Sequence, residues 1–325
     1  MSTAQRHIVF AIDVEPDGRK TVGHDPWSGL DITLRELSRL RLEIEKLTQS
    51  PGRFHFFFRF DPQIEQIGGR KDWVLHARPG FIPWLREHGD CAGIHPHFWR
   101  WNEHRQQWFT DFADAAWRAH CLHTAIEGYR SAFGRPPVAC RFGDACLSND
   151  LIPMLRDAGV RYDLTVEPGT PSHPIFDDRH ASAWVPDYRQ APRVPYHPSE
   201  ADFLVPEPQS LRETSQDPLW LVPMTSTTRT VWRRTRQFPF LQKVSLPPNL
   251  VLNPGRLWEH LSTEIERVCA EPLVFVLRCG DLVNPVFLRN FHFIAERLVT
   301  HPGLKRCRFT GVEEAVENFV KAHRQ

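Results

Sequence analysis

Two pairs of ionisable side chains, each with one residue between its members, are the first candidates for chemistry in this sequence. Asp13 and Glu15 follow one short apolar run, and His95 and His97 follow another. Residues i and i+2 of an extended chain point to the same face, so each pair presents its two side chains together. Carboxylates and imidazoles so arranged suit a divalent metal, with one carboxylate left as a general base. The alternatives are a solvated acidic turn and two structural histidines.

Two further apolar runs end in arginine. Arg59 and Asp61 close an aromatic run, and we interpret them either as substrate contacts or as a structural ion pair. Arg141 closes the run that begins at Val138, and we expect it to orient a catalytic carboxylate and control its protonation. Trp99 is the first of several tryptophans after the histidine pair. Their flat faces suit sugar rings, although packing in the core is the commoner role of a tryptophan.

These side chains lie at the ends of predicted strands that alternate with predicted helices. The strands are expected at residues 8–12, 54–60, 91–94, 138–141, 160–166, 273–277 and 307–309. The helices are expected at 31–49, 81–88, 111–133, 148–158 and 254–270, with two more that begin near Asn284 and Thr310. Strands joined by helices favour an α/β fold with a parallel sheet, closed or nearly closed into a barrel. The active site of such a barrel lies at the carboxyl ends of its strands.

The periodicity fails between residues 168 and 254, a range that holds 15 of the 28 prolines. Long irregular stretches inside a compact domain are usually functional. We therefore predict that this range covers the mouth of the barrel and lines the substrate cleft, with Tyr196 and Asp202 as substrate contacts. Its basic patch, residues 229–236, is expected to bind a phosphate or uronate group, or else to be a solvated turn.

Composition excludes several classes of protein. The chain has 325 residues, of which 41% are hydrophobic and 24% charged, and its net charge is +1. These values are those of an ordinary globular protein and give no sign of a nucleic-acid partner. No apolar stretch is long enough to span a membrane and no secretory signal precedes the first strand, so we expect a cytoplasmic protein. The seven cysteines form no C-x-x-C pair, which argues against a disulfide framework.

Taken in order, these motifs resemble the polysaccharide deacetylase (NodB-homology) family of metal-dependent carbohydrate esterases. The first motif of the family is a strand that ends in two acids, and Asp13 and Glu15 resemble its variant with one residue between them. The second motif supplies two metal-binding histidines. His95 matches the first, and His97 takes the place of the second, as in a divergent His-x-His subgroup. The third motif is matched by a set of residues along the fourth strand, the following helix and the fifth strand: Arg141, Gly143, Leu155, Gly159, Tyr162 and Asp163.

The resemblance implies a fold and an activity. The fold is a distorted (β/α)7-type barrel, with residues 1–325 as a single domain and residues 168–254 as an insertion near the active-site mouth. The activity is the hydrolysis of an N-acetyl or O-acetyl group on a sugar of a polysaccharide or glycolipid precursor. The expected partner is an acetylated glycan, with no nucleic acid and no transmembrane segment.

The resemblance also implies roles for individual residues. A divalent metal, expected to be zinc, would be bound by Glu15, His95 and His97. Asp13 would be the general base. Apart from the resemblance, we take Asp17 as a reserve ligand if the chain turns back after Pro16.

One position departs from the family. Arg278 stands at the end of the last catalytic strand, where the family has a histidine that acts as the general acid. An arginine is a poor proton donor, so we expect Arg278, with Arg141, to stabilise the oxyanion or serve the leaving group. This departure leaves two other functions open. One is a catalytically weak relative that binds glycan. The other is a metal-independent barrel glycosidase that uses Asp13 and Glu15 as its paired carboxylates.

Overall fold

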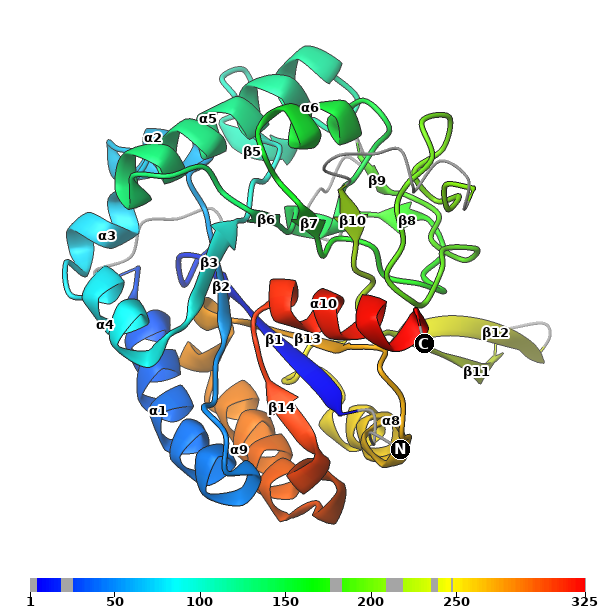
Figure 1. The fold of residues 1–325 in the computed structure, drawn as a ribbon. Helices are drawn as coiled ribbons and strands as arrows, with labels where there is room; N and C mark the ends of the chain where they lie inside the picture. Colours follow the sequence, from blue (N-terminus) through cyan, green and yellow to red (C-terminus); the bar gives the residue numbers. More distant parts are fainter. Residues whose placement is uncertain are drawn as a thin grey trace.

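A computed structural model describes residues 5–18, 26–175, 183–208, 219–234, 239–246 and 248–324, with side chains for all of these except 229–246. Eight strands form one parallel sheet. They are β1 (Arg6–Val14), β2 (His55–Phe58), β3 (Cys91–Ile94), β6 (Ala139–Cys140), β7 (Tyr162–Asp163), β10 (Trp220–Leu221), β13 (Leu273–Arg278) and β14 (Cys307–Phe309). Their order is β10-β7-β6-β3-β2-β1-β13, and β14 pairs with the beginning of β1 (Figure 1). The α/β fold predicted from the sequence is confirmed.

The sheet curls into a distorted barrel whose two edges are joined by a few hydrogen bonds. Just beyond β10, the backbone N–H of Thr225 donates to the carbonyl oxygen of Val274 at 3.0 Å, and the N–H of Val274 donates to Thr225 Oγ1 at 2.8 Å. Two residues further along β13, the N–H of Leu250 donates to the carbonyl oxygen of Val276 at 3.0 Å. These bonds pair backbone N–H and C=O groups on the edge of β13 that faces away from β1. Buried backbone groups at a sheet edge need such partners.

Helices cover the outer face of the sheet (Figure 1). They are α1 (Ser28–Thr48), α2 (Pro62–Gly68), α3 (Trp73–Ala77), α4 (Phe81–His88), α5 (Ala115–Phe133), α6 (Leu151–Asp157), α8 (Pro254–Glu266) and α9 (Pro285–Thr300). The helix predicted from residue 111 begins later, because Asp114 caps α5 by accepting from the N–H groups of Ala116 and Trp117. At the other end of α5, Gly134 takes the left-handed conformation, with φ 69°.

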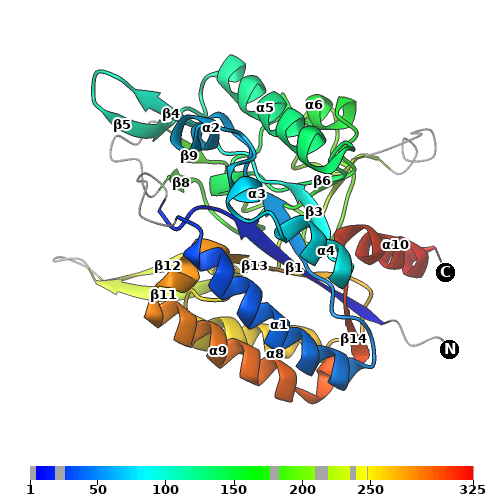
Figure 2. The same ribbon diagram turned by 90° about the vertical axis from the view of Figure 1, so that its left-hand side faces the viewer.

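Side chains alternate between two cores along the strands. On β1, Phe10 and Ile12 pack against the outer helices, whereas Val9 and Ala11 belong to a smaller core inside the barrel. α10 (Val312–His323) closes the amino end of this inner core with its apolar face (Figure 2). The middle of the barrel interior is therefore apolar, and charged side chains gather beyond it at the carboxyl end.

The proline-rich range contains more regular structure than the sequence predicts. β10 lies within residues 168–254 and is a strand of the barrel wall, although at two residues it is too short to show a periodic pattern. The rest of the described range includes two antiparallel pairs, β8 (His173–Pro174) with β9 (Trp184–Val185) and β11 (Thr227–Arg234) with β12 (Pro239–Leu246). The side chains of the predicted basic patch, residues 229–236, lie outside the described residues.

Two hairpins extend on the side of the barrel where β1 ends (Figure 2). One is β11–β12, and the other is formed by β4 (Trp99–Asn102) and β5 (Gln107–Thr110) directly after the histidine pair. Three 3-10 turns complete the described elements: η1 (Gly143–Ala145), η2 (Cys279–Val283) and η3 (Pro302–Arg306).

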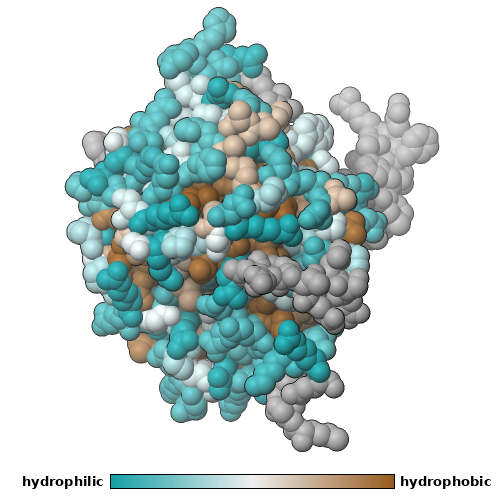
Figure 3. All heavy atoms as spheres, turned by 45° about the horizontal axis from the view of Figure 1, so that its top comes forward, coloured by the Kyte–Doolittle hydropathy of each residue, from teal (hydrophilic) through white to brown (hydrophobic). Residues whose placement is uncertain are grey.

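The face of the molecule seen in Figure 3 is mainly hydrophilic, with hydrophobic residues in small groups. Among the described residues, no helix is both long and apolar enough to cross a membrane. All seven cysteines are free thiols.

Candidate metal and active site

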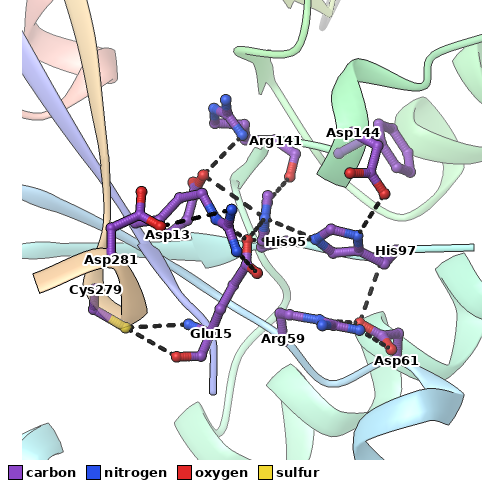
Figure 4. A network of polar contacts seen from close by, with 12 residues as sticks. Asp13, Glu15, Arg59, Asp61, His95, His97, Arg141, Asp144, Cys279 and Asp281 are labelled. Atoms are coloured by element: carbon purple, nitrogen blue, oxygen red, sulfur yellow. Dashed lines mark hydrogen bonds and ion pairs between the residues drawn. The ribbon is translucent and has the colours of Figure 1, made fainter. Parts of the chain in front are cut away.

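The polar residues at the mouth of the barrel continue the inward-facing series of their strands. On β1, Asp13 follows Val9 and Ala11 at alternate positions, and Glu15 comes next. The same rule brings Arg59, His95 and Arg141 to the mouth from the ends of β2, β3 and β6 or from the residues that follow them (Figure 4). At the end of β13 it brings Arg278 there as well, since Val274 and Val276 face the inner core. The charged groups therefore gather beyond the apolar inner core, where burial strengthens their interactions.

Glu15, His95 and His97 form a buried triangle of possible ligand atoms. Glu15 Oε1 lies 3.1 Å from His95 Nε2 and 3.5 Å from His97 Nε2, and the two Nε2 atoms are 3.2 Å apart. A tetrahedral ion with bonds of about 2.0–2.1 Å would separate its ligand atoms by about 3.3–3.4 Å. The three edges of the triangle match this spacing, so these residues fit a divalent cation.

Hydrogen bonds orient the two imidazoles. His95 Nδ1 lies 2.5 Å from the carbonyl oxygen of Arg141, which can only accept, so the lone pair of His95 is on Nε2 and faces the triangle. His97 Nδ1 lies 3.1 Å from Asp144 Oδ2, which favours the same tautomer. The indole N–H of Trp99 points at this Nδ1 from 3.0 Å and favours the opposite one. Binding a cation at Nε2 requires the tautomer that Asp144 favours.

Arg278 provides a fixed positive charge beside the triangle. Its Nε and Nη2 atoms bind Glu15 Oε1 and Oε2 at 3.2 and 3.0 Å. Burial would raise the pKa of Glu15, but the positive charge of Arg278 is the largest opposing influence, and this pKa lies well below its usual range. Burial lowers the pKa of Arg278, yet the charges of Glu15 and Asp281 raise it above the ordinary arginine value. Both groups are therefore charged.

Asp13 has one carboxylate oxygen in use and one free. Its Oδ2 atom accepts a hydrogen bond from Arg141 Nη1 at 3.0 Å and lies 3.8 Å from His95 Nε2. Its Oδ1 atom is buried and has no hydrogen-bond partner in the structure. An unsatisfied buried acceptor of this kind costs about 1–3 kcal/mol, and such groups in native proteins are often functional.

Comparison with known proteins identifies the fold. Neither a family model nor a curated protein sequence matches the chain. Among solved structures, a candidate polysaccharide deacetylase from Mycobacterium smegmatis shares 14% identity at a TM-score of 0.50, over 99% of this chain and 92% of that one. A candidate glycoside hydrolase/deacetylase from Parabacteroides distasonis shares 13% identity at a TM-score of 0.56, over 98% and 72%. The chain has the polysaccharide deacetylase (NodB-homology) fold. The expected distorted (β/α)7-type barrel is thus confirmed.

Within this deacetylase fold, Arg59 and Asp61 form an ion pair beneath His97. Arg59 Nε and Nη2 each bind an oxygen of Asp61 at 2.8 Å, and Asp61 Oδ2 accepts the backbone N–H of His97 at 3.3 Å. The side chains of Arg59 and Asp61 are 2% and 0% exposed. Trp99 is also buried, with its indole N–H on His97. The contacts of these residues hold the His97 segment in place.

The structure places the other predicted site residues away from the triangle. Tyr196 is buried in the outer core of the deacetylase fold, and its backbone pairs with Leu221. Asp202 is exposed in a turn, where its carboxylate accepts the N–H of Leu204 at 2.9 Å. Asp17, the reserve ligand, accepts the N–H of Gly29 at 2.9 Å near the start of α1.

Two residues near the triangle, Asp144 and Glu167, were missed in the sequence. Asp144 orients His97 from a left-handed position, with φ 52°. The neighbouring Gly143, which matched the third motif, leaves room for the His97 ring, which a Cβ at that position would overlap. Glu167 Oε1 lies 3.9 Å from Arg141 Nη2. Asp144 and Glu167 each come shortly after a predicted strand, so the rule that identified Asp13 could have found them too.

Proposed function

We propose that this protein is a metal-dependent carbohydrate deacetylase that removes an N- or O-acetyl group from a sugar of a polysaccharide or glycolipid precursor. The observation that carries this proposal is the triangle of Glu15, His95 and His97 beside the free Oδ1 atom of Asp13. The names of the two structural neighbours support the same chemistry. Two nitrogen ligands and one carboxylate favour zinc as the metal. We also propose that the protein acts in the cytoplasm, as expected from the sequence.

A divalent cation bound in the triangle would polarise the acetyl carbonyl and lower the pKa of a water molecule. The residues of the chain supply the rest. Asp13 would take the proton of the attacking water at Oδ1, which has no competing partner. Arg141 holds Oδ2 at 3.0 Å and so fixes the orientation of this carboxylate. Arg278 remains charged and would stabilise negative charge on the carbonyl oxygen.

The contacts of Glu15 argue against a metal-independent glycosidase. Such an enzyme needs one carboxylate as an acid and a second as a nucleophile or base. Glu15 is bound through both oxygens by Arg278 and also contacts His95 and His97, so it is neither a proton donor nor a free nucleophile. These contacts suit a metal ligand instead.

Metal analysis combined with an acetate-release assay tests the proposal. The purified protein should contain about one divalent ion per chain and release acetate from an N-acetylated oligosaccharide or an O-acetylated sugar. Activity should disappear after chelation and return when zinc is added. Full glycoside cleavage by the stripped protein would support the glycosidase instead. A bound metal without acetate release from any acetylated glycan would identify a binding protein.

A further inference from the structure

The proposed hydrolysis needs a second proton transfer, because the departing sugar nitrogen or oxygen must be protonated. Asp13 takes the first proton, from water. Arg278 cannot supply the second, since it is held as a cation by Glu15. Asp144 is bound to His97 at 3.1 Å, and Asp281 faces Arg278 at 3.7 Å.

Glu167 lies on the other side of Arg141 from Asp13. Arg141 binds Asp13 Oδ2 through Nη1 at 3.0 Å and approaches Glu167 Oε1 with Nη2 at 3.9 Å. One guanidinium therefore separates the two carboxyl groups. The side chain of Glu167 is 14% exposed and that of Asp13 is 2% exposed, so Glu167 is the more accessible of the two carboxyl groups.

The turn after Glu167 is held firmly. The carbonyl oxygen of Glu167 accepts the N–H of Thr170 at 3.2 Å, and that of Pro168 accepts the hydroxyl of Ser226 at 2.5 Å. Ser226 follows Thr225, the residue that closes the barrel onto β13. The backbone that carries Glu167 is thus held next to the contacts that close the barrel.

The surroundings of Glu167 favour its acid form. The charged groups that face it are Arg141, Asp13 and His173. Burial is the largest influence and raises the pKa of Glu167, and the negative charge of Asp13 raises it further. Arg141 and His173 act in the opposite direction without cancelling this rise.

We propose that Glu167 is the proton donor to the leaving group. This inference rests on the proposed deacetylase function. When the tetrahedral intermediate collapses, the bond between the acetyl carbon and the sugar nitrogen or oxygen breaks, and its electron pair stays on the sugar atom. The carboxyl proton of Glu167 moves to that atom. The proton that Asp13 took from water then returns Glu167 to its acid form through solvent, so that one water is consumed for each acetate released.

Substrates with different leaving groups test this role. In Glu167→Gln, acetate release from an N-acetylated oligosaccharide should fall about 100- to 10,000-fold, the usual contribution of general acid–base catalysis. Hydrolysis of 4-nitrophenyl acetate should change little, because the nitrophenolate departs without a proton. The variant should keep its metal and its unfolding temperature. Glu167→Asp, which retains an acid, should recover part of the lost activity. Glu296→Gln, on the exposed face of α9, is the matched control.

Other results would overturn the inference. Unchanged activity of Glu167→Gln on the N-acetylated substrate would exclude Glu167 as the donor. An equal loss on both substrates would show that Glu167 only positions Arg141 and Asp13. If the wild-type protein loaded with zinc hydrolyses neither substrate, the proposed deacetylase function itself is wrong. This result needs no variant, so it is distinct from a failure of the role of Glu167.

Discussion

Arg278 and Glu15 are joined by two hydrogen bonds at 3.2 and 3.0 Å, directly beside the two histidines of the candidate metal site. A protein cation therefore neutralises the carboxylate that would bind the metal. We expect Arg278→Gln to lower the free energy of unfolding of the metal-free protein by about 1–3 kcal/mol. The loss for a fully buried pair is about 3–5 kcal/mol, but the side chain of Arg278 is 24% exposed.

Bound metal should reduce this loss, because it supplies positive charge to the same carboxylate. Denaturant unfolding with a chelator and with saturating zinc measures both values. Arg289→Gln, at an exposed position of α9, is the control and should change neither. An equal loss in both conditions would mean that Arg278 and the metal do not share Glu15.

Asp13→Asn separates the general base from the ligands. Because Asn cannot accept the proton of water, acetate release should fall about 100- to 10,000-fold. The triangle of Glu15, His95 and His97 is untouched, so the metal content measured by mass spectrometry should stay near that of the wild type. Loss of both metal and activity would make Asp13 a ligand. Asp157→Asn, exposed at the end of α6, is the control.

His95→Ala should remove the metal. His95 is buried and contributes one of the three ligand atoms, and the remaining two make a much weaker site. We expect less than stoichiometric zinc after dialysis, together with loss of acetate release. His123→Ala, on the exposed face of α5, should retain both. Stoichiometric zinc in His95→Ala would show that His95 is not a ligand and that the metal is bound elsewhere.

Gly143→Ala tests the support of His97. A Cβ at Gly143 would overlap the His97 ring, which must then move away from the triangle. Residues that orient metal ligands typically change metal affinity about 10- to 100-fold, and we expect a loss of this size in a zinc competition titration. Gly255→Ala is a matched control, because a Cβ there meets no atom within 4 Å. Unchanged affinity in Gly143→Ala would show that His97 is not a ligand.

Asp163 predicts a pH dependence of stability. Burial raises its pKa from 3.8 to about 7, although its carboxylate accepts hydrogen bonds from the backbone N–H and hydroxyl of Thr165. The folded protein then binds a proton more tightly than the unfolded chain at this group. The stability it contributes is complete below about pH 4 and is lost as the pH rises toward 7.

Asp163→Asn should remove this dependence. Relative to the wild type, the variant should gain stability between pH 4 and pH 7, by up to about 4 kcal/mol for a shift of three pH units. Denaturant unfolding at several pH values measures the difference, in which other titrating groups cancel. A constant difference between the two proteins would show that Asp163 ionises normally in the fold.

Part of this fold is local in origin and could be predicted. The elements predicted from residue 8 to residue 158, and again from residue 254, follow apolar periodicity and clear stop signals, whereas α2, α3 and the β4–β5 hairpin were not predicted. β10 could not be predicted, because two residues carry no period and its role depends on pairing with β7 and leading to Thr225. The β4–β5 hairpin, which begins at Trp99, could not be predicted from its aromatic residues, because it depends on the pairing of β4 with β5.

By itself, the sequence determined which side chains share a face at a strand end, since alternation along an extended chain places Asp13 with Glu15 and His95 with His97. Only the tertiary structure decided which of these groups meet. Arg141 reaches Asp13 across 128 positions of sequence, and Arg278 reaches Glu15 across 263. Such pairs depend on the register of neighbouring strands and on how the sheet closes, and both are set by packing between distant segments. No short-range pattern records that packing.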